Sequence, residues 1–120
     1  MSKNPITHIE LSAKDPKSAG KFYGDLFDWK IVDMPEMNYI MFENEEGHGG
    51  GFVAVGEQGF SAGDIVPYVT VEDIEATLAR VEELGGNTAI GKTEIPGMGW
   101  FAIFSDPTGN RVGLYKGMEQ

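Results

Sequence analysis

The stretch SDPTGNRVGLYK, residues 105–116, contains a tight turn that leads directly into a β-strand. Asp106 opens the turn, and Gly109 can adopt the positive φ that such turns need. In the strand that follows, Leu114 lies on one face and Gly113 on the other. Glycine is a poor strand residue, because it packs nothing and loses much conformational entropy on folding. Gly113 therefore needs an explanation.

The same pattern occurs once more, in the first half of the chain. An offset of 62 residues aligns Phe42 with Phe104 and Gly51 with Gly113. Each half reads as a strand, a helix and three strands, β-α-β-β-β. One such half has a sheet face that it cannot bury alone, so two halves are expected to pair.

Hydrophobic periodicity predicts where the elements lie. A helix begins at Asp15-Pro16, an N-cap followed by proline, and its apolar residues recur at helical spacing as far as Phe27. A second helix has the same spacing and ends at Gly85-Gly86. Alternating or apolar runs predict strands at 6–11, 29–33, 38–43 and 51–55 in the first half, and at 65–71, 87–92, 99–105 and 111–116 in the second.

These elements predict an α+β fold of two paired βαβββ modules within one domain, residues 1–120. Module 1 covers about 6–55, a glycine-rich linker about 56–64, and module 2 about 65–116. A ferredoxin-like β-α-β-β-α-β sandwich is the alternative, but it has two strands too few to use all the segments.

Composition excludes several classes of function. The net charge of −10, from 9 basic and 19 acidic residues, argues against nucleic acid or an anionic membrane as a partner. The absence of cysteine rules out disulfides and thiolate chemistry and fits a reducing compartment. The start MSKNPITHIELS lacks a signal-peptide pattern, and the longest apolar run, 100–104, is too short to span a membrane. We therefore expect a cytoplasmic protein.

Three stretches carry a family resemblance. They are HIELSAKDPKSAGKFYGDLFDWK (8–30), VTVEDIEATLARVEELGG (69–86) and TEIPGMGWFAIFSDPTGNRVGLYK (93–116). Together they resemble the glyoxalase / bleomycin-resistance / extradiol-dioxygenase superfamily, also called the vicinal oxygen chelate (VOC) superfamily. The resemblance is greatest to bacterial proteins described as predicted enzymes related to lactoylglutathione lyase. It implies the glyoxalase/VOC fold, in which two βαβββ modules form a cupped sheet around a small-molecule site.

The resemblance also indicates where metal-dependent members hold a divalent ion. Carried over to this chain, the ligand positions are His8, Val66, Gly51 and Gly113. Only His8 has a donor side chain, and one imidazole cannot supply the three or four ligands that such a site needs. We therefore expect no bound metal, no cofactor, and no metal-assisted mechanism. The glycines either leave room for a ligand in the cup, or mark a bulge or a close strand contact.

Alternation along the strands predicts which residues line the cup. His8 and Glu10 share one face of the first strand, while Leu11 points toward the helix. A glutamate beside an imidazole is either an acid–base pair or a hydrated, ligand-contacting pair. The predicted ligand-binding residues are His8, Glu10, Gly51, Val66, Tyr68, Gly113 and Tyr115, of which His8 and Glu10 are the candidate catalytic residues.

Two further features give weaker signals. GHGGG, residues 47–51, lacks the Lys-Ser/Thr of a phosphate-binding loop and leads into a strand, so no phosphate-binding loop is expected here. His48 in this stretch is expected on an exposed turn between two strands. Trp100 follows a glycine-rich turn and is expected either at the rim of the cup or in the core.

Two functions from different classes remain. The first is a protein that binds a small molecule in the cup without the family's metal, as bleomycin-resistance members do. The alternative is a small lyase, isomerase or hydroxylase-type enzyme that uses His8 and Glu10. The resemblance also implies a homodimer, and the only other partner we expect is a small-molecule ligand that the sequence does not identify.

Overall fold

The computed structural model describes residues 4–118. Within this range the chain forms eight β-strands, two α-helices and two short 3-10 helices. The strands and α-helices follow one another as β-α-β-β-β, twice. This order confirms the α+β class of two βαβββ modules and leaves no place for the ferredoxin-like alternative. Contacts divide these residues into two compact units, 8–66 and 4–7 with 67–118.

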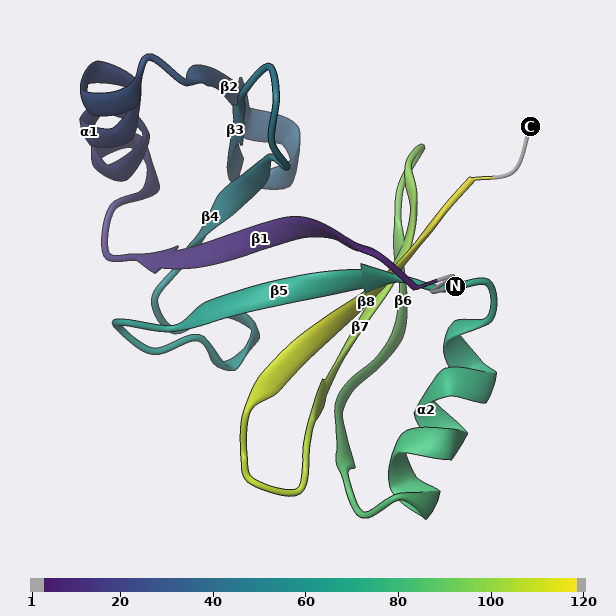
Figure 1. Ribbon diagram of the computed structural model, residues 1–120. Helices are drawn as coiled ribbons and strands as arrows, with labels where there is room; N and C mark the ends of the chain where they lie inside the picture. Colours follow the sequence, from purple (N-terminus) through teal and green to yellow (C-terminus); the bar gives the residue numbers. More distant parts are fainter. Residues whose placement is uncertain (1–3, 119–120) are drawn as a thin grey trace. The chain divides into compact units, whose positions relative to one another are not determined.

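The first unit is a four-stranded sheet with one helix on a single face. Its strands lie in the order β2-β3-β4-β1, with β1 parallel to β4 and the other pairs antiparallel. The helix α1 packs against β2, β3 and β4 (Figure 1). The elements are β1 (Ile6–Ala13), α1 (Pro16–Phe27), β2 (Lys30–Met34), a 3-10 turn (Pro35–Met37), β3 (Tyr39–Glu43), β4 (Gly50–Ala54) and a second 3-10 turn (Glu57–Gly59).

The predicted start of α1 is confirmed at atomic detail. The Asp15 side chain accepts hydrogen bonds from the backbone N–H groups of Lys17 and Ser18, at 3.2 and 3.4 Å. The helix ends at Asp28, whose φ of 62° is left-handed. Beneath the helix the core is largely aromatic. It consists of Ala13, Ile40, Phe42 and Phe52, with Leu11, Ala19, Tyr23, Trp29 and Ile31 packed against them.

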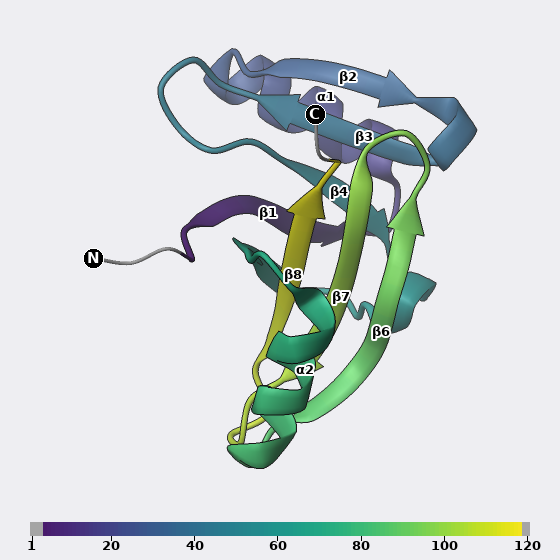
Figure 2. The same cartoon turned by 90° about the vertical axis from the view of Figure 1, so that its right-hand side faces the viewer.

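The second unit repeats this design. Its strands lie in the order β5-β8-β7-β6, with β5 parallel to β8 and the other pairs antiparallel. The helix α2 packs against β6, β7 and β8 (Figure 2). The elements are β5 (Ile65–Thr70), α2 (Ile74–Glu83), β6 (Asn87–Ile95), β7 (Gly99–Ser105) and β8 (Arg111–Gly117).

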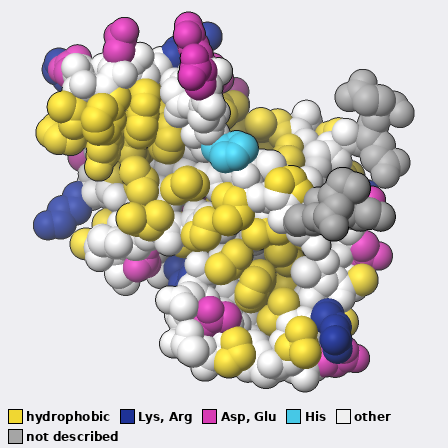
Figure 3. Space-filling view, viewed as in Figure 1, with side chains coloured by type: hydrophobic (Ala, Val, Ile, Leu, Met, Phe, Trp, Pro, Cys, Tyr) yellow, Lys and Arg dark blue, Asp and Glu magenta, His cyan; other side chains and the backbone are white. Residues whose placement is uncertain are grey.

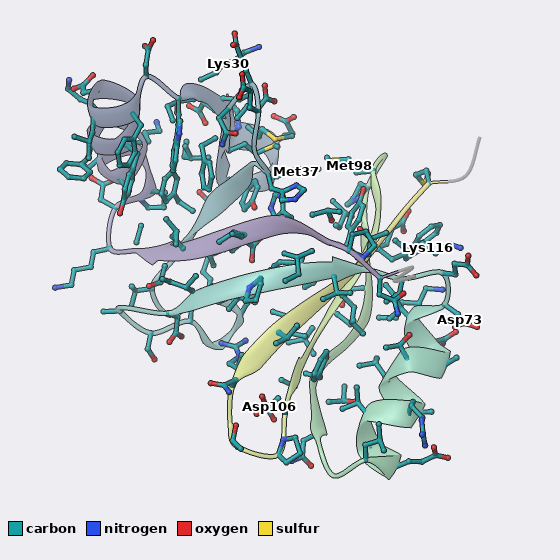
Figure 4. All side chains as sticks on the ribbon, in the orientation of Figure 1. Lys30, Met37, Asp73, Met98, Asp106 and Lys116 are labelled. Atoms are coloured by element: carbon teal, nitrogen blue, oxygen red, sulfur yellow. The ribbon has the colours of Figure 1, made fainter. Side chains whose placement is uncertain are left out.

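Local caps again explain where these elements begin and end. The Asp73 side chain accepts from the Ala76 N–H at 2.9 Å at the start of α2, where Figure 4 labels it. Gly85, with a φ of 100°, follows the helix, as the Gly85-Gly86 pair predicts. The buried residues of its core are aliphatic, namely Val71, Ile74, Leu78, Ala102 and Leu114, and Val69, Trp100 and Phe104 pack against them.

The compact units do not coincide with the linear modules. The Thr70 N–H donates to the Pro5 carbonyl at 2.9 Å, and the Thr7 and Thr70 hydroxyls lie 2.7 Å apart, so residues 4–7 group with the second unit. In the first unit, the Ser12 N–H donates to the Asp64 carbonyl at 3.0 Å. The single-domain organisation stays a prediction. Neither helix in the described range has the length and apolar character to cross a membrane.

Candidate functional site

The two polar residues of β1 lie on the face of the first sheet that α1 does not cover. β1 pairs with β4 so that Glu10 lies opposite Gly51 and Leu11 opposite Phe52. Leu11 and Phe52 belong to the core beneath α1. Because side chains alternate along a strand, Glu10 and Gly51 point to the other face, and His8 shares it. This facing is the one that the sequence predicts.

Tyr39 joins the two polar residues into one hydrogen-bonded chain. Its hydroxyl donates to Glu10 Oε2 at 2.8 Å, and His8 Nε2 lies 2.8 Å from the same hydroxyl oxygen. A phenol has one proton, so a hydroxyl that donates to Glu10 must accept from His8. The imidazole proton therefore sits on Nε2, and the chain runs from imidazole through phenol to carboxylate.

Burial sets the protonation state of the imidazole in this chain. Only 8% of Glu10 is exposed, and His8 is half-buried. Desolvation lowers the pKa of His8 below its ordinary value of 6.5, because burial disfavours the charged imidazolium. The imidazole is therefore neutral near pH 7. The Tyr39 hydroxyl gives the buried Glu10 side chain a hydrogen-bond partner, without which its burial would be costly.

Sequence reasoning missed Tyr39, although a signal was present. Ile40 and Phe42 are core residues beneath α1, so alternation along β3 places Tyr39 and Met41 on the opposite face. Met41 lies directly opposite Gly51 in the β3–β4 ladder. The apolar residues of β3 could therefore have predicted the face on which Tyr39 lies.

Gly51 does not leave open room on this face. A Cβ at Gly51 would overlap the Tyr39 hydroxyl and ring. The tyrosine thus occupies the space that a side chain at position 51 would take. Of the two alternatives for this glycine, the position of Tyr39 favours a close contact across strands, and a ligand contact at Gly51 stays a prediction.

Gly113 is covered in the same way in the second unit. Tyr68 on β5 lies directly opposite Gly113 on β8, and a Cβ at Gly113 would overlap the Tyr68 ring. Only 4% of Tyr68 is exposed. Tyr115 faces the same side as Gly113, and its hydroxyl donates to the Met98 carbonyl at 3.1 Å. The expected space at Gly113 is therefore also filled, here by a buried ring.

The residues at the family's ligand positions can be compared with the donor set that a transition metal needs. Within residues 4–118, no three histidine, aspartate or glutamate side chains gather closely enough to hold an ion. Val66, which is 1% exposed, has no donor atom in its side chain. The spaces at Gly51 and Gly113 are taken by tyrosines. This side-chain set does not fit the three- or four-ligand shell of a transition metal.

The remaining candidates lie elsewhere. Trp100 packs against the core cluster beneath α2, so it is a core residue, and the Lys92 ammonium lies 5.2 Å from its ring centroid. His48 is exposed in the turn between β3 and β4, as predicted.

The chain belongs to the Glyoxalase/Bleomycin resistance protein/Dioxygenase superfamily, whose family model matches residues 5–114. Among curated proteins it is similar to the "Putative glyoxylase CFP32" of Mycobacterium bovis and that of Mycobacterium tuberculosis. Each is 27% identical over 123 residues, which cover 90% of this chain and 44% of the relative. The chain therefore spans less than half the length of these relatives.

Solved structures show the same fold at low sequence identity. Methylmalonyl-CoA epimerase from Mycobacterium tuberculosis has a TM-score of 0.74 at 10% identity, covering 99% of this chain and 93% of the epimerase. A superfamily member from Vibrio splendidus has a TM-score of 0.67 at 16% identity, covering 95% of this chain and 99% of that one. At these identities the likeness defines the fold alone.

Proposed function

We propose that this protein binds a small molecule on the helix-free face of its first sheet, without the metal that other members of its superfamily hold. The observation that carries the proposal is the hydrogen-bonded chain of His8, Tyr39 and Glu10. A few fixed polar groups on an otherwise apolar surface are what orients a small ligand in a protein site.

The composition of this face supports a ligand more than a purely structural role. Burying a carboxylate is costly, and an apolar residue at position 10 would pack without that cost. Instead, Glu10 is buried and held by Tyr39, which also takes a hydrogen bond from His8. Such a satisfied network is rigid, so it presents its polar atoms in a fixed geometry.

Two features support binding without a tightly held metal. The imidazole proton on His8 Nε2 is directed at Tyr39, so this nitrogen is engaged within the protein. The tyrosine rings that cover Gly51 and Gly113 take the space that additional ligand side chains would need. Contacts from Gly51, Val66, Tyr68, Gly113 and Tyr115 to a ligand remain predictions from the sequence.

A ligand screen by thermal shift, run with and without added divalent metals, tests the proposal. A ligand present at a hundred times its Kd adds about 2.7 kcal/mol of stability. We expect at least one compound to raise Tm without metal. His8→Gln and Tyr39→Phe should each weaken its binding at least tenfold by calorimetry. Tyr39→Phe is the sharper variant, because it keeps the ring over Gly51 and removes only the hydroxyl.

His48→Gln is the matched control, since His48 is the other histidine and is exposed. It should leave the affinity unchanged. A hit that binds equally well to His8→Gln and Tyr39→Phe would contradict the assigned face. Separately, elemental analysis that finds about one transition metal per chain, lost on His8→Ala, would overturn the metal-free part of the proposal.

The second candidate function is acid–base catalysis by the same chain. It is favoured by the lowered pKa of His8, because a neutral imidazole can accept a proton near pH 7. Deuterium incorporation from D2O into a hit ligand, followed by NMR, tests this without knowledge of the product. Exchange that is lost when His8 or Glu10 is substituted would support the catalytic function. If the ligand binds but no deuterium is incorporated, only the binding function is supported.

A further inference from the structure

An apolar groove lies on the side of the first sheet that α1 covers. Its volume is about 200 Å³. Leu11 and Phe52, which belong to the core beneath α1, come to it from the sheet. The lining residues all belong to the first unit, namely Leu11, Ser12, Ala19, Tyr23, Phe52, Gly63, Asp64 and Ile65. Because His8 and Glu10 point to the other face of the sheet, this groove is distinct from the site proposed above.

Apolar side chains beside the groove are open to solvent. On α1, Phe22 and Leu26 are 59% and 56% exposed, and Ile65 in the lining is 63% exposed. Figure 3 shows hydrophobic side chains gathered over α1, at the upper left of the view. Tyr23 links them to the groove, since its ring centroid lies 5.0 Å from that of Phe22 and 5.7 Å from that of the buried Phe52. A ligand in the groove would therefore cover apolar surface that is otherwise in water.

Asp64 gives the groove a charged group that is fixed in place. Its backbone N–H donates to Ser12 Oγ at 3.1 Å, and its carbonyl accepts from the Ser12 N–H at 3.0 Å. Its Oδ2 accepts from the Ser61 N–H at 2.8 Å, across a turn in which Gly63 has a φ of 90°. A carboxylate has about four acceptor sites, so it can serve Ser61 and a ligand together. The lining turn is therefore ordered before any ligand binds.

The charges around the groove favour a cation. Asp64 is the one charged residue among those that line it. Successive residues of a helix are about 100° apart, so Lys17 and Lys21 lie about 160° from Ala19, on the far side of α1 from the groove. There the Lys17 ammonium lies 4.0 Å from the Asp33 carboxylate on β2. A carboxylate beside an apolar groove, with the helix lysines directed away, attracts an ammonium group and repels an anion.

We propose that this groove binds a small aromatic amine, a single apolar ring that carries a protonated amine on a short linker. The ring lies against Leu11 and Tyr23, and the ammonium group contacts the Asp64 carboxylate. The size fits, because an apolar cavity of about 150 Å³ holds a benzene ring and this groove has about 200 Å³. Tyr23 adds an aromatic surface on which such a ring can stack.

NMR titration with three probes of similar size tests the requirement for positive charge. Phenethylamine, phenethyl alcohol and phenylacetate are a cation, a neutral molecule and an anion at pH 7. We expect phenethylamine to bind with a Kd of about 1 mM, which nine non-hydrogen atoms reach at an ordinary affinity per atom. Phenethyl alcohol should bind about fivefold more weakly, and phenylacetate more weakly still. The amide signals of residues 11, 12, 23 and 63–65 should shift.

Asp64→Asn removes the charge, and its amide oxygen can still accept from the Ser61 N–H. It should weaken phenethylamine binding about fivefold and leave phenethyl alcohol unchanged. Asp28→Asn is the matched control, because it makes the same change of charge outside the groove lining. The left-handed φ of 62° at Asp28 also suits asparagine. Equal weakening in both variants would assign the effect to overall charge, against the proposal.

Ala19→Leu places a larger side chain in the groove and should abolish binding of both phenethylamine and phenethyl alcohol. Ala79→Leu makes the same change at an exposed position of α2 and should leave both affinities unchanged. Leucine is a good helix former, so circular dichroism should show both variants folded. If Ala19→Leu does not fold, the comparison of Asp64→Asn with Asp28→Asn still decides the result.

The absence of a saturable shift up to about 10 mM phenethylamine overturns the proposal, because a ring that fits the groove reaches a lower Kd. Phenylacetate that binds as tightly as phenethylamine overturns it too. Shifts at residues 8, 10 and 39 in place of those around the groove would put the amine on the helix-free face. That outcome contradicts this proposal and supports the function proposed above, so the two can fail separately.

Discussion

The two units share one architecture but differ in where they place their chemistry. In both, a tyrosine from a neighbouring strand covers a glycine, Tyr39 over Gly51 and Tyr68 over Gly113. In the first unit that tyrosine bridges a histidine and a glutamate. The repeat therefore preserves a backbone arrangement, on which the first unit carries a hydrogen-bonded chain of polar side chains.

The two units also differ in the side chains that form their cores. The first unit packs stacked aromatic rings, with Trp29 and Phe42 centroids 4.6 Å apart and Tyr23 and Phe52 centroids 5.7 Å apart. The second unit buries aliphatic side chains, against which Trp100 and Phe104 pack. Large rings carry more buried area per residue, so fewer of them stabilise a sheet of the same size.

The largest expected effect separates the two cores. Phe52→Ala should lower the free energy of unfolding by about 3–5 kcal/mol, and Leu114→Ala by about 2–5 kcal/mol. Phe52 is 1% and Leu114 is 2% exposed, so both substitutions leave a cavity. Urea denaturation measures each value. If Phe52→Ala costs clearly less than Leu114→Ala, then the aromatic core is not the stronger of the two.

The covered glycines should differ in their tolerance of a side chain. Gly113→Ala should cost about 1–3 kcal/mol, because its Cβ would meet the buried ring of Tyr68. Gly51→Ala should cost less, because it meets the hydroxyl end of the half-buried Tyr39. Urea denaturation ranks the two variants. The reverse ranking would mean that the hydrogen-bonded chain is stiffer than the buried ring.

The pH dependence of stability tests the burial of His8 in the first unit. The pKa of His8 is lowered in the folded state, so below its ordinary value of 6.5 the unfolded chain binds a proton that the folded one does not. Stability should therefore fall as the pH drops below about 6.5, by at most about 1.4 kcal/mol per pH unit from this group.

Urea denaturation of wild type, His8→Gln and His48→Gln between pH 7 and 5 separates this contribution from the rest. His8→Gln should flatten the acid slope, whereas His48→Gln should keep it, since His48 is exposed. An unchanged slope in His8→Gln would show that the imidazole titrates alike in the folded and unfolded chain.

The smallest effect concerns the equivalent turns before β4 and β8. At 62 residues apart, Asn44 accepts from the Gly47 N–H at 2.6 Å, and Asp106 accepts from the Thr108 and Asn110 N–H groups at 2.9 Å each. Hydrogen bonds from Asn110 and Thr108 lower the pKa of Asp106 to about 2. Asn110→Ala should raise that pKa toward 3.8, measured by carboxyl NMR, with little change in Tm. A pKa that stays near 2 would assign the shift to Thr108 and to the backbone N–H of residue 110, which the substitution retains.

Most of the fold could be predicted from the chain because its signals are local. The Asp15-Pro16 cap, the helical spacing that follows and Gly85-Gly86 each define an element through short-range physics. The predicted ends of the strands were less accurate. β1 extends to Ala13 and β6 to Ile95, beyond the alternating residues, because ladder hydrogen bonds continue where the apolar pattern stops.

The candidate site could be predicted only in part. Alternation placed His8, Glu10, Gly51, Tyr68 and Gly113 on the correct faces of their strands. It did not show what fills the space beside each glycine, because a tyrosine lies on a different strand from the glycine that it covers.

The sequence by itself determined the two βαβββ modules, the helix caps and the faces of β1 and β8, because caps, turns and side-chain periodicity act over a few residues. Only the tertiary structure decided that Tyr39 links His8 to Glu10, that two tyrosines close the glycine positions, and that α1 leaves an apolar face exposed. These depend on strand register and on how a helix packs on its sheet. Both are set by contacts between residues far apart in the chain.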